Sequence, residues 1–167
     1  MNTAPSGTVN GSDLLVNFNG KATGHSTSHT TTFTSETKET AVKPKASVPK
    51  SSASKFKNKI VSGLAVQIKA EGLVVYSEDE SGLKAFLAKW KVGASVEASC
   101  FERENDSAPY VSGNFIITSL EVSSPAGEDT TYNVTLDNDG PVDIDESKFD
   151  PDTEEEDPQD PESPETA

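Results

Sequence analysis

Alternating apolar and polar residues near the carboxyl end of the chain predict a two-stranded β-hairpin. Residues 113–122 are dense in β-branched and aromatic residues, and residues 130–136 alternate strictly between apolar and polar. Turn formers at 123–129 connect the two strands, and residues 137–141, DNDGP, are expected to end the second. The apolar face of the second strand consists of Tyr132, Val134 and Leu136. This period of two is typical of a sheet with one buried face.

The amino-terminal region predicts a second hairpin. Residues 13–18 alternate as a strand, and Asn19-Gly20 is a strong signal for a tight hairpin turn. The returning strand, residues 22–35, is almost free of apolar residues but rich in threonine, so it favours extended structure. Such a strand lies at an edge of a sheet, or its outer face meets water or another subunit. We expect one face of it to carry Thr23, His25, Thr27, His29 and Thr31.

Residues 37–58 have neither a helical nor a strand period, and they contain two prolines and several lysines. A loop of this length is usually functional or disordered. One interpretation is a solvated loop, and another is an arm that docks on an acidic surface of a neighbouring copy. Contact with nucleic acid is disfavoured, because no arginine and only one phenylalanine accompany the lysines.

The middle of the chain changes from a strand period to a helical period. Residues 59–76 predict one long bent strand or two strands, with a bend or bulge at Gly72. Residues 77–80 form a capping box, and a helix is expected over 78–92, with Gly93 as its end. Its apolar stripe, which we expect to cover the sheet, consists of Leu83, Phe86, Leu87 and Trp90. Residues 94–104 then return to a strand pattern, with Val96, Ala98 and Cys100 on one side.

Six or more strands and one helix in this order predict a mainly β fold. We expect a β-sandwich or open barrel of two packed sheets with one flanking α-helix. The β domain is expected over residues 13–142, after a flexible amino-terminal arm at 1–12. Residues 143–167 are expected to form a disordered acidic tail.

The net charge of −14 is concentrated in that tail. Residues 143–167 hold twelve acids and one lysine, which leaves about −3 for the rest of the chain. The tail is also rich in proline and buries little apolar area, so it is either a solubilising segment or a charged segment that restrains self-association or binds a basic partner.

The sequence offers no chemistry typical of an enzyme. We find no pairing of nucleophile and base, no phosphate-binding loop and no spacing of metal ligands, so we expect no catalytic, cofactor or metal site. His25 and His29, four apart on a strand, would lie about 13 Å from each other, too far to share an ion. The single cysteine, Cys100, excludes an intrachain disulfide and reads as a small buried residue.

No apolar run is long enough to cross a membrane, and the amino terminus lacks the pattern of a signal peptide. We therefore expect a protein that is made and used in a reducing cytoplasm and has no membrane partner.

Three stretches in a fixed order resemble the major tail proteins, or tail tube proteins, of long-tailed bacteriophages. The last hairpin reads G-x-x-x-I-T-S-L-E, then a Pro/Gly/acidic turn, then T-Y-x-V-T-L. The opening G-S-D-L-L-V-N-F-N-G-K-A-T-G-H-S-T-S-H and the middle G-L-A-V-Q-I-K-A-E-G-L-V are similar to the same family. The resemblance covers roughly residues 11–142, and it departs from the family in the Lys/Ser/Pro-rich loop and the acidic tail.

The resemblance implies a structural virion protein. Six copies would form a ring, each giving strands to a continuous β-barrel, and rings would stack into the tail tube that conducts the genome. The implied partners are other copies of the chain, the tape measure, tail terminator and distal tail proteins, and double-stranded DNA that passes through the lumen without sequence-specific binding. Its implied place is the virion tail, assembled in the bacterial cytoplasm. The alternatives are a tube subunit of a phage-tail-like particle, and a stand-alone immunoglobulin-like or carbohydrate-binding module, which would expose aromatic residues on its loops; here Tyr110 is the main such residue.

Overall fold

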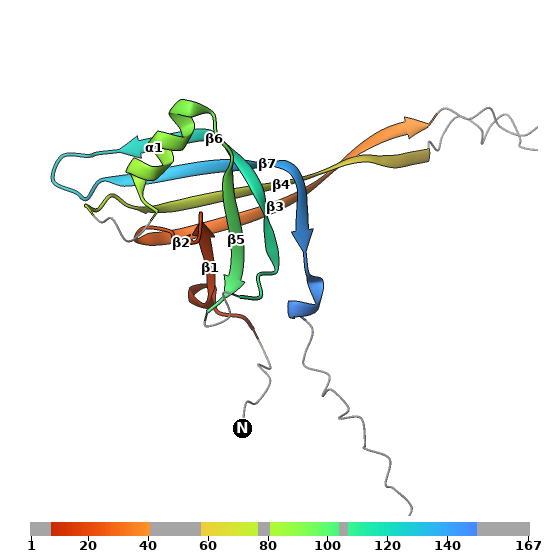
Figure 1. Ribbon diagram of the computed structural model, residues 1–167, viewed down its shortest axis with the longest axis horizontal. Coiled ribbons are helices and arrows are strands. Elements are labelled where there is room, and N and C mark those ends of the chain that lie inside the picture. The colour runs from red at the N-terminus through yellow and green to blue at the C-terminus, as the bar shows by residue number, and fades with distance from the viewer. Residues whose placement is uncertain (1–7, 41–57, 77–80, 104–106, 150–167) are drawn as a thin grey trace, which may run out of the picture.

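Seven strands form one antiparallel sheet with a single α-helix packed on it, in a computed structural model that describes residues 8–40, 58–76, 81–103 and 107–149 (Figure 1). The order of strands across the sheet is β2-β1-β5-β6-β7-β4-β3. The elements are β1 (Leu14–Phe18), β2 (Lys21–Ala22), β3 (Ser26–Thr40), β4 (Asn58–Leu73), α1 (Leu83–Val92), β5 (Val96–Glu102), β6 (Val111–Ser123) and β7 (Thr131–Ile144), with short 3-10 helices η1 (Gly11–Asp13) and η2 (Glu146–Phe149). The predicted mainly β class with one helix is confirmed.

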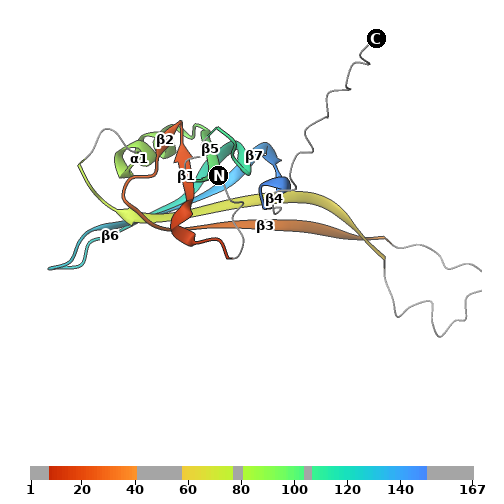
Figure 2. The same cartoon turned by 90° about the horizontal axis from the view of Figure 1, so that it is seen from below.

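The sheet folds over on itself and so supplies both layers of the domain. Strands β3 and β4 run along one layer, while β1, β2, β5 and α1 lie above them (Figure 2). The expected two sheets are therefore two parts of one continuous sheet. Strand β6 pairs with β5 of the upper layer, β7 pairs with β4 of the lower layer, and β6 and β7 pair with each other. The result is an open barrel in which Thr31 Oγ1 of β3 lies 3.8 Å from Cys100 Sγ of β5.

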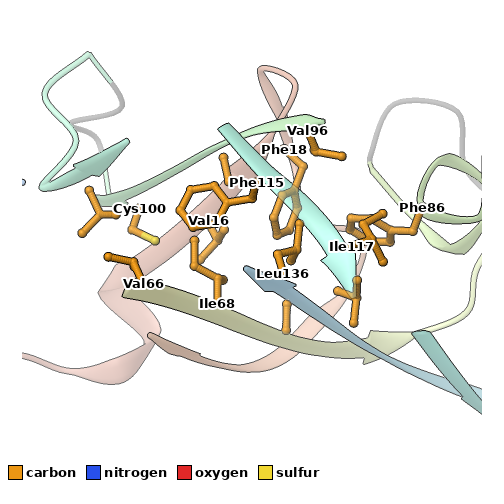
Figure 3. Packing of buried hydrophobic residues seen from close by; sticks show 14 of the residues in the cluster. Val16, Phe18, Val66, Ile68, Phe86, Val96, Cys100, Phe115, Ile117 and Leu136 are labelled. Carbon is orange, nitrogen blue, oxygen red and sulfur yellow. The ribbon is translucent and has the colours of Figure 1, made fainter. Parts of the chain in front are cut away.

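The core lies between the two layers, where side chains from both converge (Figure 3). Val16 and Cys100 point from the upper layer toward Val66 and Ile68 of the lower one (Figure 3). Alternation along each strand produces this arrangement, since Val66, Ile68 and Ala70 are buried and the residues between them are not. The predicted apolar faces of β5 and β7 are confirmed as buried: Val96, Ala98, Cys100, Tyr132, Val134 and Leu136.

Helix α1 begins at Leu83, later than the predicted start at residue 78. Ser81 forms an isolated β-bridge with Thr23 and therefore lies outside the helix. Its N–H donates to Ala22 O, and its hydroxyl donates to Phe18 O at 2.9 Å. Gly82 is the N-cap and makes no side-chain hydrogen bond, while the capping box at 77–80 lies outside the described residues. Gly93 ends the helix in the left-handed conformation, with φ of 66°, as expected.

The apolar stripe of α1 is only partly covered. Phe86 is buried, with its ring edge-on to Phe18 at 5.0 Å between centroids, and Leu83 packs on the core. Leu87 and Trp90, which were expected to cover the sheet, are exposed.

The opening hairpin departs from its prediction after the turn. Asn19 and Gly20 both have positive φ, as the turn signal requires, but the returning strand β2 has only two residues. Thr23 then bridges to Ser81, and His25 adopts a φ of 40°, so the chain turns before β3 begins at Ser26. The expected common face is therefore wrong for Thr23, which is buried outside the strand, and for His25. Thr27 lies at a register shift between Ser26 and Ser28, and only His29 and Thr31 share the inward face.

Strands β3 and β4 extend beyond the rest of the sheet as a two-stranded arm (Figure 1). We define the arm as residues 34–40 and 58–65. The predicted loop at 37–58 is thus shorter than expected, because pairing continues to Thr40 and resumes at Asn58. Threonines and short polar residues support extended structure there although no alternation marks it. Residues 41–57 lie outside the described part of the chain.

The carboxyl end is more ordered than its composition suggests. Strand β7 was expected to stop at residues 137–141, but it bends at Gly140, where φ is 88°, and continues to Ile144 beside Val111. Helix η2 follows, and the ring of Phe149 packs on Tyr110 at 5.0 Å. Residues 143–149 therefore continue the folded structure, because Ile144 pairs with Val111 and the N–H of Asp145 donates to Tyr110 O at 2.9 Å, whereas 150–167 lie outside the described residues. Residues 1–7 of the expected amino-terminal arm do so as well.

Gly72 was predicted to mark a bend or bulge, and it pairs with Ser26 at the register shift between Ser26 and Ser28; it also serves close packing. The hydroxyl of Tyr132 donates a hydrogen bond to Gly24 O at 2.7 Å, which ties β7 to the turn before β3. A Cβ built at Gly72 would lie 2.7 Å from Tyr132 Oη and 2.8 Å from Gly24 O. Only glycine leaves room for this contact.

We expect Gly72→Ala to lower the free energy of unfolding by about 1–3 kcal/mol, because the added methyl forces apart two groups joined by a buried hydrogen bond. Denaturant unfolding followed by circular dichroism measures the change. Gly11→Ala is the matched control, since nothing lies within 4 Å of its Cβ and the expected change is below about 0.5 kcal/mol. Equal stability of the two variants would contradict the role assigned to Gly72.

Candidate functional site

The sequence offers two histidines and one cysteine as candidate chemical groups. Within the described ranges, no group of three or more His, Cys, Asp or Glu side chains is placed to hold a metal ion. His25 lies in an exposed turn and His29 on β3, so the structure does not bring them together as a pair. Burial raises the pKa of the Cys100 thiol, which leaves it protonated and unreactive. Among the described helices, α1 and the two 3-10 turns, none is long and apolar enough to span a membrane.

The candidate functional surface is the outer face of the four strands β6-β7-β4-β3. Residues on this face alternate with the core residues, and all but Ile116 and Ala65 of those named here are polar. We call this surface the polar face; it comprises Ser28, Thr30, Thr32, Thr34 and Glu36 of β3, Ala65, Gln67, Lys69 and Glu71 of β4, Thr131, Asn133, Thr135 and Asp137 of β7, and Ile116, Ser119, Glu121 and Ser123 of β6.

The polar face is acidic and internally hydrogen-bonded. Its charged residues are Glu36, Glu71, Glu121, Asp137 and Lys69. Gln67 Nε2 donates to Asp137 Oδ1 at 2.8 Å, and Asn133 Nδ2 donates to Glu71 Oε1 at 3.1 Å. Four carboxylates and one ammonium give the face a net charge of about −3, so it repels polyanions.

Two strand edges of this four-stranded part are open. Strand β3 pairs only with β4 along its whole length. Strand β6 pairs with β5 through Phe115 and not beyond, so residues 116–123 have an open edge on the side away from β7. The threonine-rich strand was expected to lie at an edge of a sheet or to expose its outer face to water or another subunit, and the edge position is confirmed. The open edge of β6 was missed, because the sequence does not show where β5 leaves β6.

The direction of backbone groups on these edges follows from one hydrogen bond. Val66 N–H donates to Asn138 Oδ1, on the β7 side of β4, at 3.0 Å. Because backbone groups alternate in direction along a strand, the N–H groups of Gln67, Lys69 and Ala65 point toward β3 and pair with Thr32, Thr30 and Thr34. The N–H groups of Thr31, Phe33 and Ser35 therefore point away from the sheet. The same alternation directs those of Leu120 and Val122 outward from β6.

An even number of antiparallel strands also makes the two edges complementary. Strands β6 and β3, at the two ends of this set of four, run in opposite directions. A rotation that places β3 of one copy beside β6 of the next joins them antiparallel, so the sheet continues from copy to copy without a change of pattern.

A hollow of about 460 Å³ lies where the barrel remains open, between β3, the end of β7 and η2. Its apolar lining residues are Leu14, Phe33, Tyr110, Ile144 and Phe149. Burial, together with Cys100, raises the pKa of Tyr110 to about 12. Tyr110, expected to be exposed, is thus part of the core, whereas the exposed aromatic side chains in the described part of the chain are Phe33, Tyr76, Trp90 and Phe149.

Comparison with known proteins gives the class. The family described as phage tail tube protein matches residues 8–143, and the chain belongs to this family. Its role is that of a structural subunit of a tail tube, as the resemblance implied. No curated protein matches.

The solved structures that share the fold include two of gene transfer agent particles. One is the virion of a native gene transfer agent (GTA) particle, with 15% sequence identity and a TM-score of 0.62. The other is the tail of an empty GTA particle with C6 symmetry, with 14% identity and a TM-score of 0.64. Each alignment covers 83% of this chain and 99% of the other.

The half-buried His29 makes stability depend on pH. Burial lowers its pKa, so between that value and about 6.5 the unfolded chain binds more protons than the folded one. The contribution of the neutral imidazole is present above pH ~6.5 and is lost as the pH falls below it. We expect His29→Gln to flatten the dependence of the urea midpoint on pH between about 5 and 7.5.

His25→Asn is the control for that measurement, because its side chain lies in an exposed turn. If the slope of the urea midpoint against pH changes equally in both variants, His29 is not the source of the pH dependence of stability.

Proposed function

We propose that six copies of this chain form a ring in which β3 of each copy pairs with β6 of the next, and that rings stack into a tube that conducts double-stranded DNA. The observation that carries this proposal is the pair of open, oppositely directed edges on one four-stranded sheet. Membership of the tail tube family and the shared fold with the C6-symmetric GTA tail support it.

Pairing of strand edges between neighbouring copies stabilises the ring. Each junction satisfies backbone groups that the isolated copy leaves to water, notably the N–H groups of Thr31, Phe33, Leu120 and Val122. A closed barrel has no edge, so ring closure removes the surface most prone to uncontrolled pairing. Four strands from each of six copies form one continuous wall.

The polar face lines the lumen in this arrangement. The opposite face of the same strands packs on the core of each copy, so only the polar face is free to meet the channel. Hydroxyl and amide groups keep the wall wetted, and the excess of carboxylates prevents the phosphate backbone from binding during passage. DNA therefore passes through the channel without sequence-specific contacts.

The location and further partners follow from the tube. We infer that the protein resides in the tail of the virion, is assembled in the bacterial cytoplasm, and contacts the tape measure, tail terminator and distal tail proteins. It has no enzymatic role in this proposal. The GTA likeness supports a tube in a phage-like particle as well as in an infectious phage, and the same edges and lumen serve both.

We expect Ser35→Pro to prevent ring formation while leaving the monomer folded. Its N–H points away from β4, so proline removes a donor from the open edge without breaking the β3–β4 ladder. The mass of the particles in solution, measured by light scattering with negative-stain electron microscopy, gives the result. The wild type is expected to form rings or tubes, and the variant to remain monomeric at the same concentration.

Ser35→Ala, which keeps the N–H, is the matched control and should assemble as the wild type does. Tubes of normal appearance from Ser35→Pro would overturn the pairing of β3 with a neighbour.

Reversing a lumen charge should weaken the repulsion between the channel and DNA. We expect Glu121→Lys tubes to retain more short duplex DNA than wild-type tubes at low salt and to release it as salt rises, because the change takes the polar face from a net charge of about −3 to about −1 per copy. Fluorescence of labelled duplex in sedimented tubes measures binding.

Glu97→Lys is the matched control, since Glu97 is exposed on β5 outside the polar face. Equal retention of DNA by both variants would show that the polar face does not line the channel.

A further inference from the structure

The hollow beside η2 is an unfilled apolar surface with an acidic rim. Phe33, Ile144 and Phe149 are each about half exposed although they line it together. Asp145 and Glu146 border the same hollow, and Lys148 Nζ lies 3.8 Å from Asp145 Oδ2, which leaves these three side chains with a net charge of about −1. The pKa of Asp145 is lowered, chiefly by hydrogen bonds from Ser147, which keeps this rim charged at neutral pH. Such a surface fits an apolar knob surrounded by positive charge.

Helix α1 presents a knob of that kind. Trp90 is 54% exposed and Leu87 44% exposed, on the side of the apolar stripe that the core leaves uncovered. The helix carries Lys84, Lys89 and Lys91 and no carboxylate. An exposed tryptophan flanked by cations is typical of a residue that anchors an interface.

We propose that α1 of one copy docks in the hollow of a second copy in the next ring, with Trp90 and Leu87 against Phe33 and Phe149. The lysines of α1 then lie against Asp145 and Glu146. This proposal rests on the proposed ring, which it extends by naming the surfaces through which rings stack.

The two surfaces lie at different places along the strands. Helix α1 lies near the end of the sheet from which the β6–β7 turn projects, and η2, which borders the hollow, lies nearer the arm (Figure 1). Across the strands, α1 packs on β6 and the hollow is lined by β3, so the displacement along the strands is what assigns the contact to a second ring. A knob and a hollow at different places on one copy form a heterologous contact, which repeats without limit and builds a tube.

Cross-linking between two variants tests the contact directly. Protein with Leu87→Cys is mixed with protein carrying Glu146→Cys, allowed to assemble, and treated with a short bismaleimide. We expect covalent dimers in the mixture and none from either variant alone, because position 87 faces position 146 of another copy. The wild type controls for the buried Cys100, which should not react.

The outcomes separate this inference from the proposed ring. Rings or tubes without cross-linked dimers would overturn the docking of α1 and leave the ring intact. Neither rings nor dimers would overturn both. Dimers from one variant alone would show a symmetric contact and would also overturn the proposal.

A second variant tests the energetic role of the knob. We expect Trp90→Ser to raise the concentration needed for tube growth about tenfold or more, as loss of an anchoring tryptophan does, while single rings persist. Val92→Ser is the matched control, because this exposed residue of α1 lies off the stripe. Loss of rings as well as tubes from Trp90→Ser would place the contact inside the ring and overturn stacking through α1. Unchanged tube growth by Trp90→Ser would overturn it too.

Discussion

Strands β6 and β7 belong to both layers of the domain, and the rest of the structure depends on this sharing. The first part of β6 pairs with β5, and the remainder pairs only with β7. Gly140 lets β7 bend with it and continue to Ile144. Because one sheet turns back over itself, the core can form between its two parts. For the same reason β6 separates from β5 after Phe115, and its remaining residues have an open edge. The fold and the assembly surface thus have one cause.

The two faces of the four-stranded sheet then have separate tasks. One face holds Val66, Ile68, Val134 and Leu136, and it is closed by the upper layer and Phe86. The polar face contributes little to the stability of the single copy, so its hydroxyls, amides and carboxylates can vary at small cost to folding. The threonine-rich composition of β3 follows from this division, since a strand with one wet face and one open edge needs extended propensity more than apolar bulk.

Sequence reasoning succeeded where alternation or a single special residue decides the structure. The buried faces of β5 and β7, the Asn19-Gly20 turn and the end of α1 at Gly93 were all predictable for this reason. Sequence reasoning failed where contacts between distant parts of the chain determine the bounds of an element. Ser81 is held by β1 and the turn before β3, which delays the start of α1, and nothing in the local pattern shows those partners.

The candidate site was partly predictable. The edge character of β3 follows from its composition, but the open edge of β6 depends on where β5 ends, a fact of three-dimensional pairing. The carboxyl-terminal turn was assigned to the tail because acids outnumber its two apolar residues, yet the contact of Phe149 with Tyr110 outweighs that composition. The hollow has no sequence signal, since its lining comes from β1, β3, β7 and η2.

The arm formed by the ends of β3 and β4 has a kinetic consequence. Two strands alone are marginally stable in water, and Leu64 on the arm is 75% exposed, with no layer above it. Such a segment opens and closes readily, and fixing it costs conformational entropy. Any surface that covers the arm must therefore offset this entropy, and covering the arm is slower than joining two surfaces that are already fixed.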